Sequence, residues 1–131
     1  MLTNVFYIST AVYPRDHASN MDILLTSRAL NSQRHLTGFL FRTDQNFMQF
    51  LEGGAPEINA VMHAIQKDPR HSNLQEWPRR SSRERVFPDW SMGYGNGLNA
   101  ENLASVVRNY GFDMPYDKLT AHLRELAAPD L

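Results

Sequence analysis

The side chains best suited to do chemistry in this sequence are polar residues that interrupt apolar runs. Tyr7 and Gln49 each lie inside an otherwise apolar segment of strand length. Ser27 and Asn31 stand four residues apart in a segment with helical periodicity, so they share one helix face. A buried amide left without a hydrogen-bond partner costs about 1 to 3 kcal/mol. These groups must therefore bond to one another, to water, or to a flat polar ligand.

The composition excludes several kinds of reaction. The 131 residues contain no cysteine, which rules out disulfides, Cys-ligated metals, a thiolate nucleophile and a thioether link to a cofactor. None of the five histidines is paired with another at the i, i+4 spacing typical of a helical zinc site, so we predict no metal. Chemistry must come from Tyr, Trp, Gln, Asn, His, Arg or carboxylate side chains.

The balance of charged residues also limits the classes of partner that this chain is expected to bind. Thirteen Lys and Arg against fourteen Asp and Glu give a net charge of -1, which does not favour a nucleic-acid partner. Mean hydropathy is -0.47, and no run approaches the roughly 20 apolar residues that cross a bilayer. The first residues lack a basic segment followed by an apolar one. We therefore expect no membrane partner and a cytoplasmic location.

Hydrophobic periodicity predicts the elements that carry these residues. Apolar runs of strand length occur at 2–10, 36–42 and 47–51, and the last two are joined by the polar connection 43–46. Apolar spacings of 3, 4 and 7 predict helices at 21–33, with Ser19 or Asn20 as N-cap, and from Pro56 to about 68. Further predictions are an edge strand within 74–86, a short strand at 90–94, and helices at 100–110 and 116–127.

This order predicts one α+β domain of the ferredoxin-like type, a β-α-β-β-α-β-β sandwich with a C-terminal helical tail. Both helices of the sandwich are expected on one sheet face, with strands one and three adjacent and parallel. The tail should cover the opposite face with an apolar stripe formed by Leu103, Val106, Val107, Leu119, Leu123 and Leu126.

Taken singly, the polar residues have ordinary structural interpretations. A strand Tyr is common in cores, and Asn31 near a helix end is commonly a cap. Trp90 and Met92 are by default core residues. Gln49 is more informative, because glutamine is mostly found exposed. No one of these residues defines a site.

Together, however, the segments resemble the BLUF family of blue-light sensors using FAD. The matching segments are the strand-one Tyr7, Ser-Arg-Ala-Leu-Asn at 27–31, Leu-Thr-Gly at 36–38, Phe-Met-Gln-Phe-Leu-Glu-Gly at 47–53, Asp-Pro-Arg-His-Ser at 68–72, and Phe-x-x-Trp-Ser-Met at 87–92. The resemblance runs from about residue 2 to about residue 95. It implies a photosensor domain at 1–96, with 97–131 as its helical cap.

The resemblance implies non-covalent FAD with its ring between the two sandwich helices. Tyr7 and Gln49 would carry the photochemistry, with Tyr7 as electron and proton donor and Gln49 as the amide that rearranges beside the flavin. Trp90 and Met92 would transmit the signal. Ala64 departs from the family, which often has a basic side chain there, so His63 or Arg70 is expected to compensate. The cofactor-binding residues implied are Leu24, Leu25, Ser27, Arg28, Asn31, Gln49, Ile65, Asp68, Arg70 and His71.

The leading interpretation is a light sensor that is not an enzyme. About 36 residues follow the last predicted strand, too few for a catalytic output domain, so the signal must pass to a separate, unidentified protein. We also expect a homo-oligomer. The alternative is a small ferredoxin-like enzyme or a dark ligand-binding module, in which Tyr7, Gln49 and His71 handle a small molecule.

Overall fold

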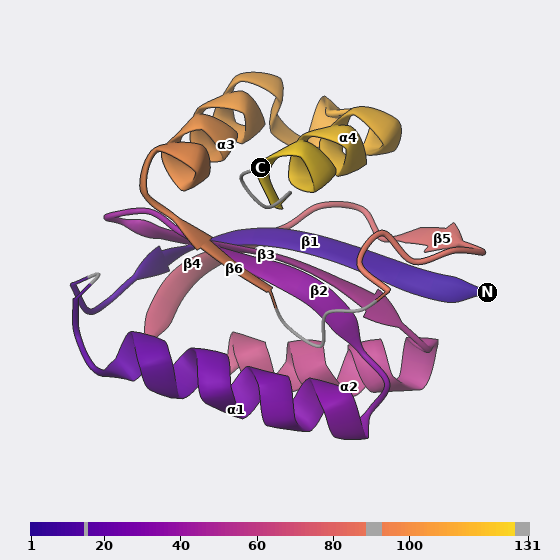
Figure 1. Cartoon of the computed structure of the whole chain (residues 1–131), viewed down its shortest axis with the longest axis horizontal. Coiled ribbons are helices and arrows are strands. Elements are labelled where there is room, and N and C mark those ends of the chain that lie inside the picture. The colour runs from indigo at the N-terminus through magenta and orange to yellow at the C-terminus, as the bar shows by residue number, and fades with distance from the viewer. Residues whose placement is uncertain (15, 89–92, 128–131) are drawn as a thin grey trace.

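The structure is a computed structural model that describes residues 1–14, 16–88 and 93–127. It is an α+β sandwich in which one sheet lies between two pairs of helices (Figure 1). The elements in chain order are β1 (Leu2–Ala11), α1 (Ser19–Gln33), β2 (Thr37–Arg42), β3 (Asn46–Gly53), α2 (Ala55–Gln66), β4 (His71–Glu76), β5 (Arg80–Ser82), β6 (Gly93–Asn96), α3 (Gly97–Tyr110), the short 3-10 helix η1 (Gly111–Asp113) and α4 (Tyr116–Ala127).

The strand order is β4-β1-β3-β2-β6, with β5 also paired to β1. Strand β3 is antiparallel to both β1 and β2, whereas β2 and β6 are parallel. The prediction that strands one and three are adjacent is confirmed, but the prediction that they are parallel is wrong. The crossover through α1 makes β1 and β2 parallel, and the hairpin that follows reverses β3 between them.

Several element boundaries differ from the sequence prediction. The edge strand expected within 74–86 is two strands, β4 and β5, because Pro78 offers no N–H to a sheet ladder. Helix α1 begins after Ala18, with no side-chain cap bond, so neither Ser19 nor Asn20 is the cap. The strand expected at 90–94 is β6 (Gly93–Asn96), and the predicted positions 90–92 lie outside the described residues.

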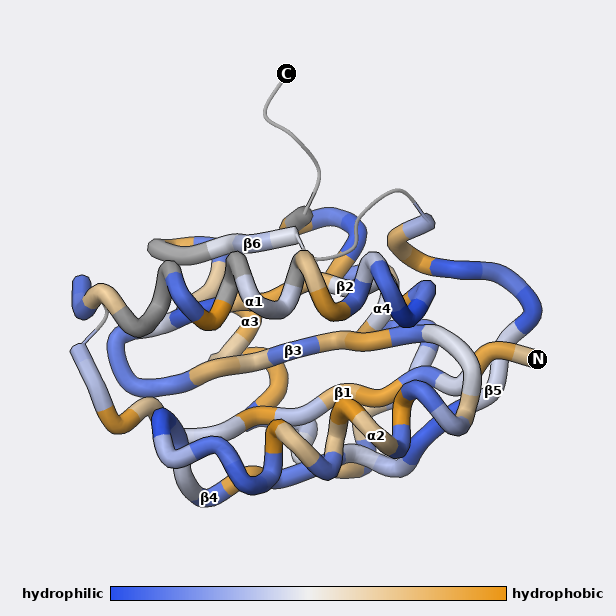
Figure 2. Tube along the Cα trace, turned by 90° about the horizontal axis from the view of Figure 1, so that it is seen from below, coloured by the Kyte–Doolittle hydropathy of each residue, from blue (hydrophilic) through white to orange (hydrophobic). Residues whose placement is uncertain are grey.

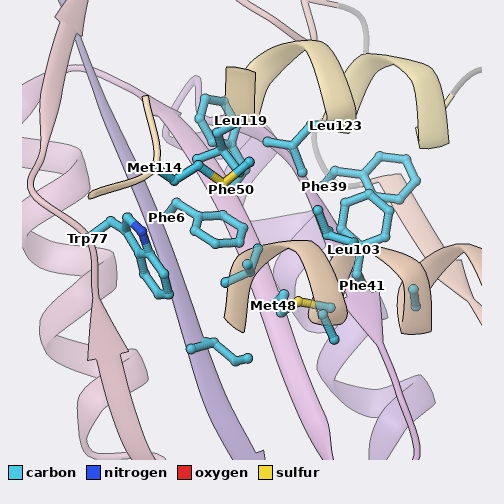
Figure 3. Packing of buried hydrophobic residues seen from close by; sticks show 14 of the residues in the cluster. Phe6, Phe39, Phe41, Met48, Phe50, Trp77, Leu103, Met114, Leu119 and Leu123 are labelled. Atoms are coloured by element: carbon cyan, nitrogen blue, oxygen red, sulfur yellow. The ribbon is translucent and has the colours of Figure 1, made fainter. Parts of the chain in front are cut away.

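The two faces of the sheet carry separate apolar clusters. Helices α1 and α2 lie on one face, and α3 and α4 lie on the other (Figure 1). Leu103, Val107, Leu119 and Leu123 are buried on the α3/α4 side, while Val106 and Leu126 pack partly buried against them. Figure 3 shows this cluster, in which Phe50 and Leu123 come from the sheet and from α4. The tail helices therefore cover the face that the sandwich helices leave open.

On the other face, β3 runs between α1 and α2, as the view from below shows (Figure 2). The apolar residues buried there include Leu40, Leu51, Ile58 and Met62. Because side chains alternate along a strand, successive residues of β3 point alternately into the two clusters. Among the described residues, no helix is both long and apolar enough to span a membrane.

Position 38, at the start of β2, has room only for glycine. A Cβ atom built at this position would lie 2.0 Å from the carbonyl oxygen of Phe50 on the neighbouring strand. Backbone cannot move away as a flexible side chain can, so any larger residue would push β2 and β3 apart. The glycine therefore allows β2 and β3 to approach closely in the register that places Leu40 opposite Gln49.

Candidate functional site

A cavity of about 180 Å³ lies among α1, α2 and the face of the sheet between them. Its walls are mainly apolar, and polar groups enter from both the sheet and the helices. The lining residues are Tyr7, Ile23, Thr26, Ser27, Leu30, Asn31, Arg34, Leu40, Phe47, Gln49, Val61, Ala64, Ile65, Asp68, Arg70 and His71. An apolar slot with a few polar groups is the usual form of a small-molecule site.

Tyr7 and Gln49 meet at the floor of this cavity. The antiparallel register of β1 and β3 sets them directly opposite each other, and both are buried. The Tyr7 hydroxyl donates to Gln49 Oε1 at 2.5 Å. Burial, reinforced by the negative charge of Asp68, raises the pKa of the Tyr7 hydroxyl. Tyr7 is therefore a neutral phenol whose proton already points at an amide.

His71 closes the floor beside this pair. Its Nε2 lies 2.6 Å from the carbonyl oxygen of Ile65, and its Nδ1 lies 2.7 Å from the Ser9 hydroxyl. A carbonyl oxygen can only accept, so Nε2 carries the hydrogen, and Nδ1 accepts from Ser9 when the ring is neutral. These two bonds hold the imidazole edge-on to the Tyr7 ring, with 6.2 Å between ring centroids.

Asp68 and Arg70 form the charged rim of the cavity. The Arg70 guanidinium contacts both carboxylate oxygens of Asp68, at distances from 2.5 to 3.0 Å. The Arg70 backbone N–H adds a further bond to the same carboxylate. Hydrogen bonding to Arg70 lowers the pKa of Asp68. The pair is therefore ionised on both sides at neutral pH and presents a fixed dipole to any bound molecule.

Helix α1 supplies the opposite wall. Asn31 is 1% exposed, and Ser27, one turn earlier, is half-buried. The backbone carbonyl of Asn31 accepts from the N–H groups of Arg34 and Leu36, which end the helix. Asn31 also lines the cavity.

The structure brings together eight of the sequence-predicted site residues. Tyr7, Ser27, Asn31, Gln49, Ile65, Asp68, Arg70 and His71 all line the cavity. Leu24, Leu25 and Arg28 lie within α1, but their side chains are outside what the structure describes. Trp90 and Met92 also lie outside the described residues.

Sequence reasoning missed several lining residues, although some signals for them were present. Ile23, Leu30 and Arg34 continue the helix face of Ser27 at spacings of 3, 4 and 7 residues. Phe47 lies two residues before Gln49, which places it on the same face of β3. The approach of Ser9 to His71 joins residues 62 positions apart, and no local pattern indicates it.

The site and fold match a known family. The family model described as sensors of blue light using FAD, BLUF, matches residues 2–93. The chain therefore belongs to the BLUF family, whose members bind a flavin and signal to effectors. Over 92 residues, 70% of this chain, it is 32% identical to a photoactivated adenylate cyclase subunit beta of Euglena gracilis. Over 76 residues, 58% of this chain, it is 30% identical to the blue light- and temperature-regulated antirepressor BluF of Escherichia coli.

These curated relatives are much longer proteins. The chain spans 11% of the length of the cyclase subunit and 19% of that of the antirepressor. Solved structures similar over nearly the whole chain include BlrB, a BLUF protein, in its dark state, at 26% identity and a TM-score of 0.81 over 96% of both chains. BlsA in its photo-activated state matches at 27% identity and a TM-score of 0.81, over 99% of this chain and 97% of that one. The α+β, ferredoxin-like fold prediction is thereby confirmed.

The cavity residues suit a flavin. A flavin ring is flat, aromatic and edged with polar atoms, so it needs apolar walls and donors or acceptors at its rim. Leu40, Phe47 and Ile65 provide apolar surface, while Asn31 and Gln49 each offer an amide. Among the described residues, no cluster of His, Cys, Asp and Glu gathers as a metal site.

Proposed function

We propose that this chain is a blue-light photoreceptor that holds FAD non-covalently and switches by rearranging the Gln49 hydrogen bond. The observation that supports this most strongly is the 2.5 Å bond from the Tyr7 hydroxyl to Gln49 Oε1 at the cavity floor. A phenol is the side chain most easily oxidised among those lining the cavity, and a glutamine amide can both donate and accept.

In this mechanism Tyr7 holds a transferable proton and Gln49 relays it. A flavin held in the cavity would supply, on excitation, a reversible acceptor for one electron and one proton. Both return to Tyr7, so the cycle has no net chemical product. Loss of the phenol proton would remove the Tyr7 hydrogen bond to Gln49 Oε1, and the Gln49 amide would then rotate or tautomerise. The altered Gln49 amide would then offer a bound flavin a different hydrogen bond, which would shift the absorption to longer wavelength.

The remaining predicted residues have roles in the same proposal. Leu24, Leu25 and Ile65 form apolar walls, and Ser27, Arg28 and Asn31 contact the cofactor from α1. Asp68, Arg70 and His71 contact its polar edge or its phosphate-bearing tail. His63 or Arg70 would replace the basic side chain that Ala64 lacks. The cavity lining supports the assignments of Ser27, Asn31, Ile65, Asp68, Arg70 and His71, and it does not include His63.

The output in this proposal is a separate protein. The chain works as a sensor and not as an enzyme, with 1–96 as the photosensor and 97–131 as its cap. Trp90 and Met92 transmit the state of Gln49 toward the tail helices and an unidentified downstream partner. A homo-oligomer and a cytoplasmic location belong to the same proposal, which includes no nucleic-acid or membrane partner.

An absorption spectrum of the purified chain tests this function. We expect a yellow protein that releases FAD on denaturation and shows a reversible red shift under blue light. Release of FMN or riboflavin instead would correct the cofactor while leaving the photochemistry standing. A colourless protein that cannot be loaded with any flavin would overturn the proposal and favour the dark ligand-binding module.

A further inference from the structure

A second polar centre lies behind the sheet, on the side away from the cavity. Glu52 is on the same strand as Gln49, three residues further along, so its side chain points to the opposite face. Its side chain is 0% exposed. The surroundings are those of the α3/α4 cluster, in which Phe50 and Phe87 lie with ring centroids 5.9 Å apart. A carboxylate in such a place needs an explanation.

The Glu52 carboxylate is held by donors from a distant segment. Oε1 accepts the backbone N–H of Val86 at 2.8 Å, and Oε2 accepts the backbone N–H of Phe87 at 2.7 Å. The Thr37 hydroxyl, on β2, donates to Oε2 at 3.2 Å. Glu52 thus joins β3 to a segment 34 and 35 residues away.

Arg85 adds three hydrogen bonds to this group of contacts, none of them to the Glu52 carboxylate. Its Nη1 donates to the Thr37 hydroxyl at 2.9 Å and to the Glu52 backbone carbonyl at 3.0 Å, and Nη2 donates to the His35 carbonyl at 2.8 Å. The Thr37 hydroxyl therefore accepts from Arg85 and donates to Glu52. All three donors to the Glu52 side chain match an ionised acceptor.

Stability alone does not explain this residue. Burial raises the pKa of Glu52, although the N–H groups of Phe87 and Val86 and the charge of Arg85 oppose the shift. A raised pKa in the folded state means that the ionised form costs stability at neutral pH. Well-packed apolar residues often replace buried charges with no loss of stability. The functional value of these hydrogen bonds must then lie in the position in which they hold residues 85–87 against β3.

We propose that Glu52 is a positioning residue that ties the strand of Gln49 to residues 85–87 and so couples the cavity floor to the chain leading into β6. This inference rests on the proposed function for its photochemical consequence. The connection is mechanical: Phe50, next to Gln49, packs on the Phe87 ring, while Glu52 holds the Phe87 backbone. A shift of β3 at Gln49 thus reaches Phe87 through two contacts, one of the side chain and one of the main chain.

Other groups near Glu52 define what a variant would disturb. Burial raises the pKa of the Tyr116 hydroxyl on α4, and the Glu52 charge raises it further. Arg124, on the same helix, acts on Tyr116 in the opposite direction. A neutral residue at 52 therefore removes one negative charge facing Thr37, Arg85 and Tyr116, and leaves the cavity lining untouched.

Glu52→Gln is the central test, with Glu84→Gln as the matched control. Glutamine keeps the shape but offers one acceptor oxygen, so its NH₂ group must face an N–H of Val86 or Phe87. Glu84 is an exposed carboxylate close in the chain. We expect E52Q to lose hydrogen-exchange protection at the Val86 and Phe87 amides and to speed dark recovery by about threefold or more. Its dark flavin spectrum should match that of the parent, and E84Q should change neither protection nor recovery.

A second variant keeps the test decisive if E52Q does not fold. Thr37→Val removes one donor to Glu52 while preserving side-chain shape, and it should accelerate recovery in the same direction by a smaller factor. Unchanged amide protection and recovery in the variant tested would overturn the inference. A parent protein that binds no flavin would instead overturn the proposed function, and the exchange measurement would still decide whether Glu52 positions residues 85–87.

Discussion

At the scale of single residues, the pairing of Tyr7 with Gln49 is the feature from which a switch can be built. The two side chains are opposite each other in the β1–β3 ladder and share a short hydrogen bond. The apolar surroundings keep the phenol protonated, because burial disfavours its anion. The donor is therefore in its reactive form before any light arrives.

Replacing the phenol should separate cofactor binding from switching. Tyr7→Phe removes one hydroxyl and leaves the cavity shape almost unchanged, so flavin should still bind. The light-induced red shift should disappear, because phenylalanine is much harder to oxidise and gives Gln49 no hydroxyl to bond. Gln49→Leu should likewise bind flavin and fail to switch. Tyr116→Phe, which removes a buried hydroxyl on the opposite face, is the control and should keep the shift. A Tyr7→Phe protein with the parental shift would contradict the mechanism.

The Asp68–Arg70 ion pair should make the stability of the protein depend on pH in the acid range. Asp68 has a lowered pKa in the folded chain, so the folded state holds its proton more weakly than the unfolded state. The stabilisation by this pair is therefore full above the ordinary pKa of aspartate and is lost as pH falls through the lowered value. Because both side chains are partly exposed, we expect the ion pair to contribute less than about 1 kcal/mol to the free energy of unfolding.

Denaturant unfolding of the parent and of Asp68→Asn at several pH values measures this effect. The two free energies of unfolding should differ at neutral pH and converge in acid. Glu57→Gln, at a half-buried carboxylate in the first turn of α2 that is outside this ion pair, should show a smaller difference or none. A difference that persists unchanged into acid would show that Asp68 acts through packing and not through its charge.

At the scale of elements, helices α1 and α2 are attached to the sheet differently. Helix α2 buries Ile58, Val61 and Met62 against it. Among the side chains of α1 that the structure describes, the buried one is the polar Asn31. The cavity occupies the space where α1 would otherwise pack. A bound flavin would then supply apolar contact that α1 lacks.

Hydrogen exchange with and without flavin tests this difference. We expect loading to protect the amides of α1 strongly and those of α2 weakly, because α2 has its own packed face. The amides of α4, on the far side of the sheet, serve as an internal control and should change least. Equal protection of α1 and α2 would show that α1 is held by the protein itself.

The tail helices should contribute to folding through their buried stripe. Leu123 on α4 is 0% exposed, so Leu123→Ala should lower the free energy of unfolding by about 2 to 5 kcal/mol. Leu98→Ala, at a position 74% exposed, should change it by less than about 0.5 kcal/mol. Deleting 98–131 should expose the apolar face and cause aggregation. A soluble, monomeric and fully photoactive truncation would show that the tail is not structural.

At the scale of the whole molecule, two of the basic residues near β5, Arg79 and Arg85, are bound to neighbouring groups. Arg79 contacts Glu76 at 2.5 Å and Asn59 at 2.6 Å. Arg85 is committed to Thr37 and two backbone carbonyls. With a net charge of -1, the chain lacks the excess positive charge that nucleic-acid binders use.

We therefore expect no salt-sensitive binding of DNA or RNA at micromolar protein. Fluorescence anisotropy with single- and double-stranded oligonucleotides at low salt is a sensitive check. Arg80→Glu, at an exposed position, provides a comparison, since a true site there would lose affinity in the variant. Binding by the parent that weakens as salt is added would contradict this prediction.

The linear sequence was enough for the properties that depend on local periodicity. Alternating and helical apolar spacings predicted the main strands and both pairs of helices, because burial repeats every 2 or 3.6 residues along the chain. Polar interruptions at Tyr7, Asn31 and Gln49 drew attention to the cavity, since buried polar groups require partners. The stripe through Leu103 and Leu123 indicated the second face for the same reason.

Other features emerged only when distant segments were brought together. The direction of β3 relative to β1, the bond from Ser9 to His71, and the hold of Glu52 on Val86 and Phe87 all join residues far apart in the chain. Such contacts depend on register and crossover, which are set by the packing of the whole sheet and not by any short pattern. In the sequence Glu52 marks only the end of a strand. In the structure the alternation of side chains turns its carboxylate into the core, where the backbone N–H groups of Val86 and Phe87 and the Thr37 hydroxyl bond to it.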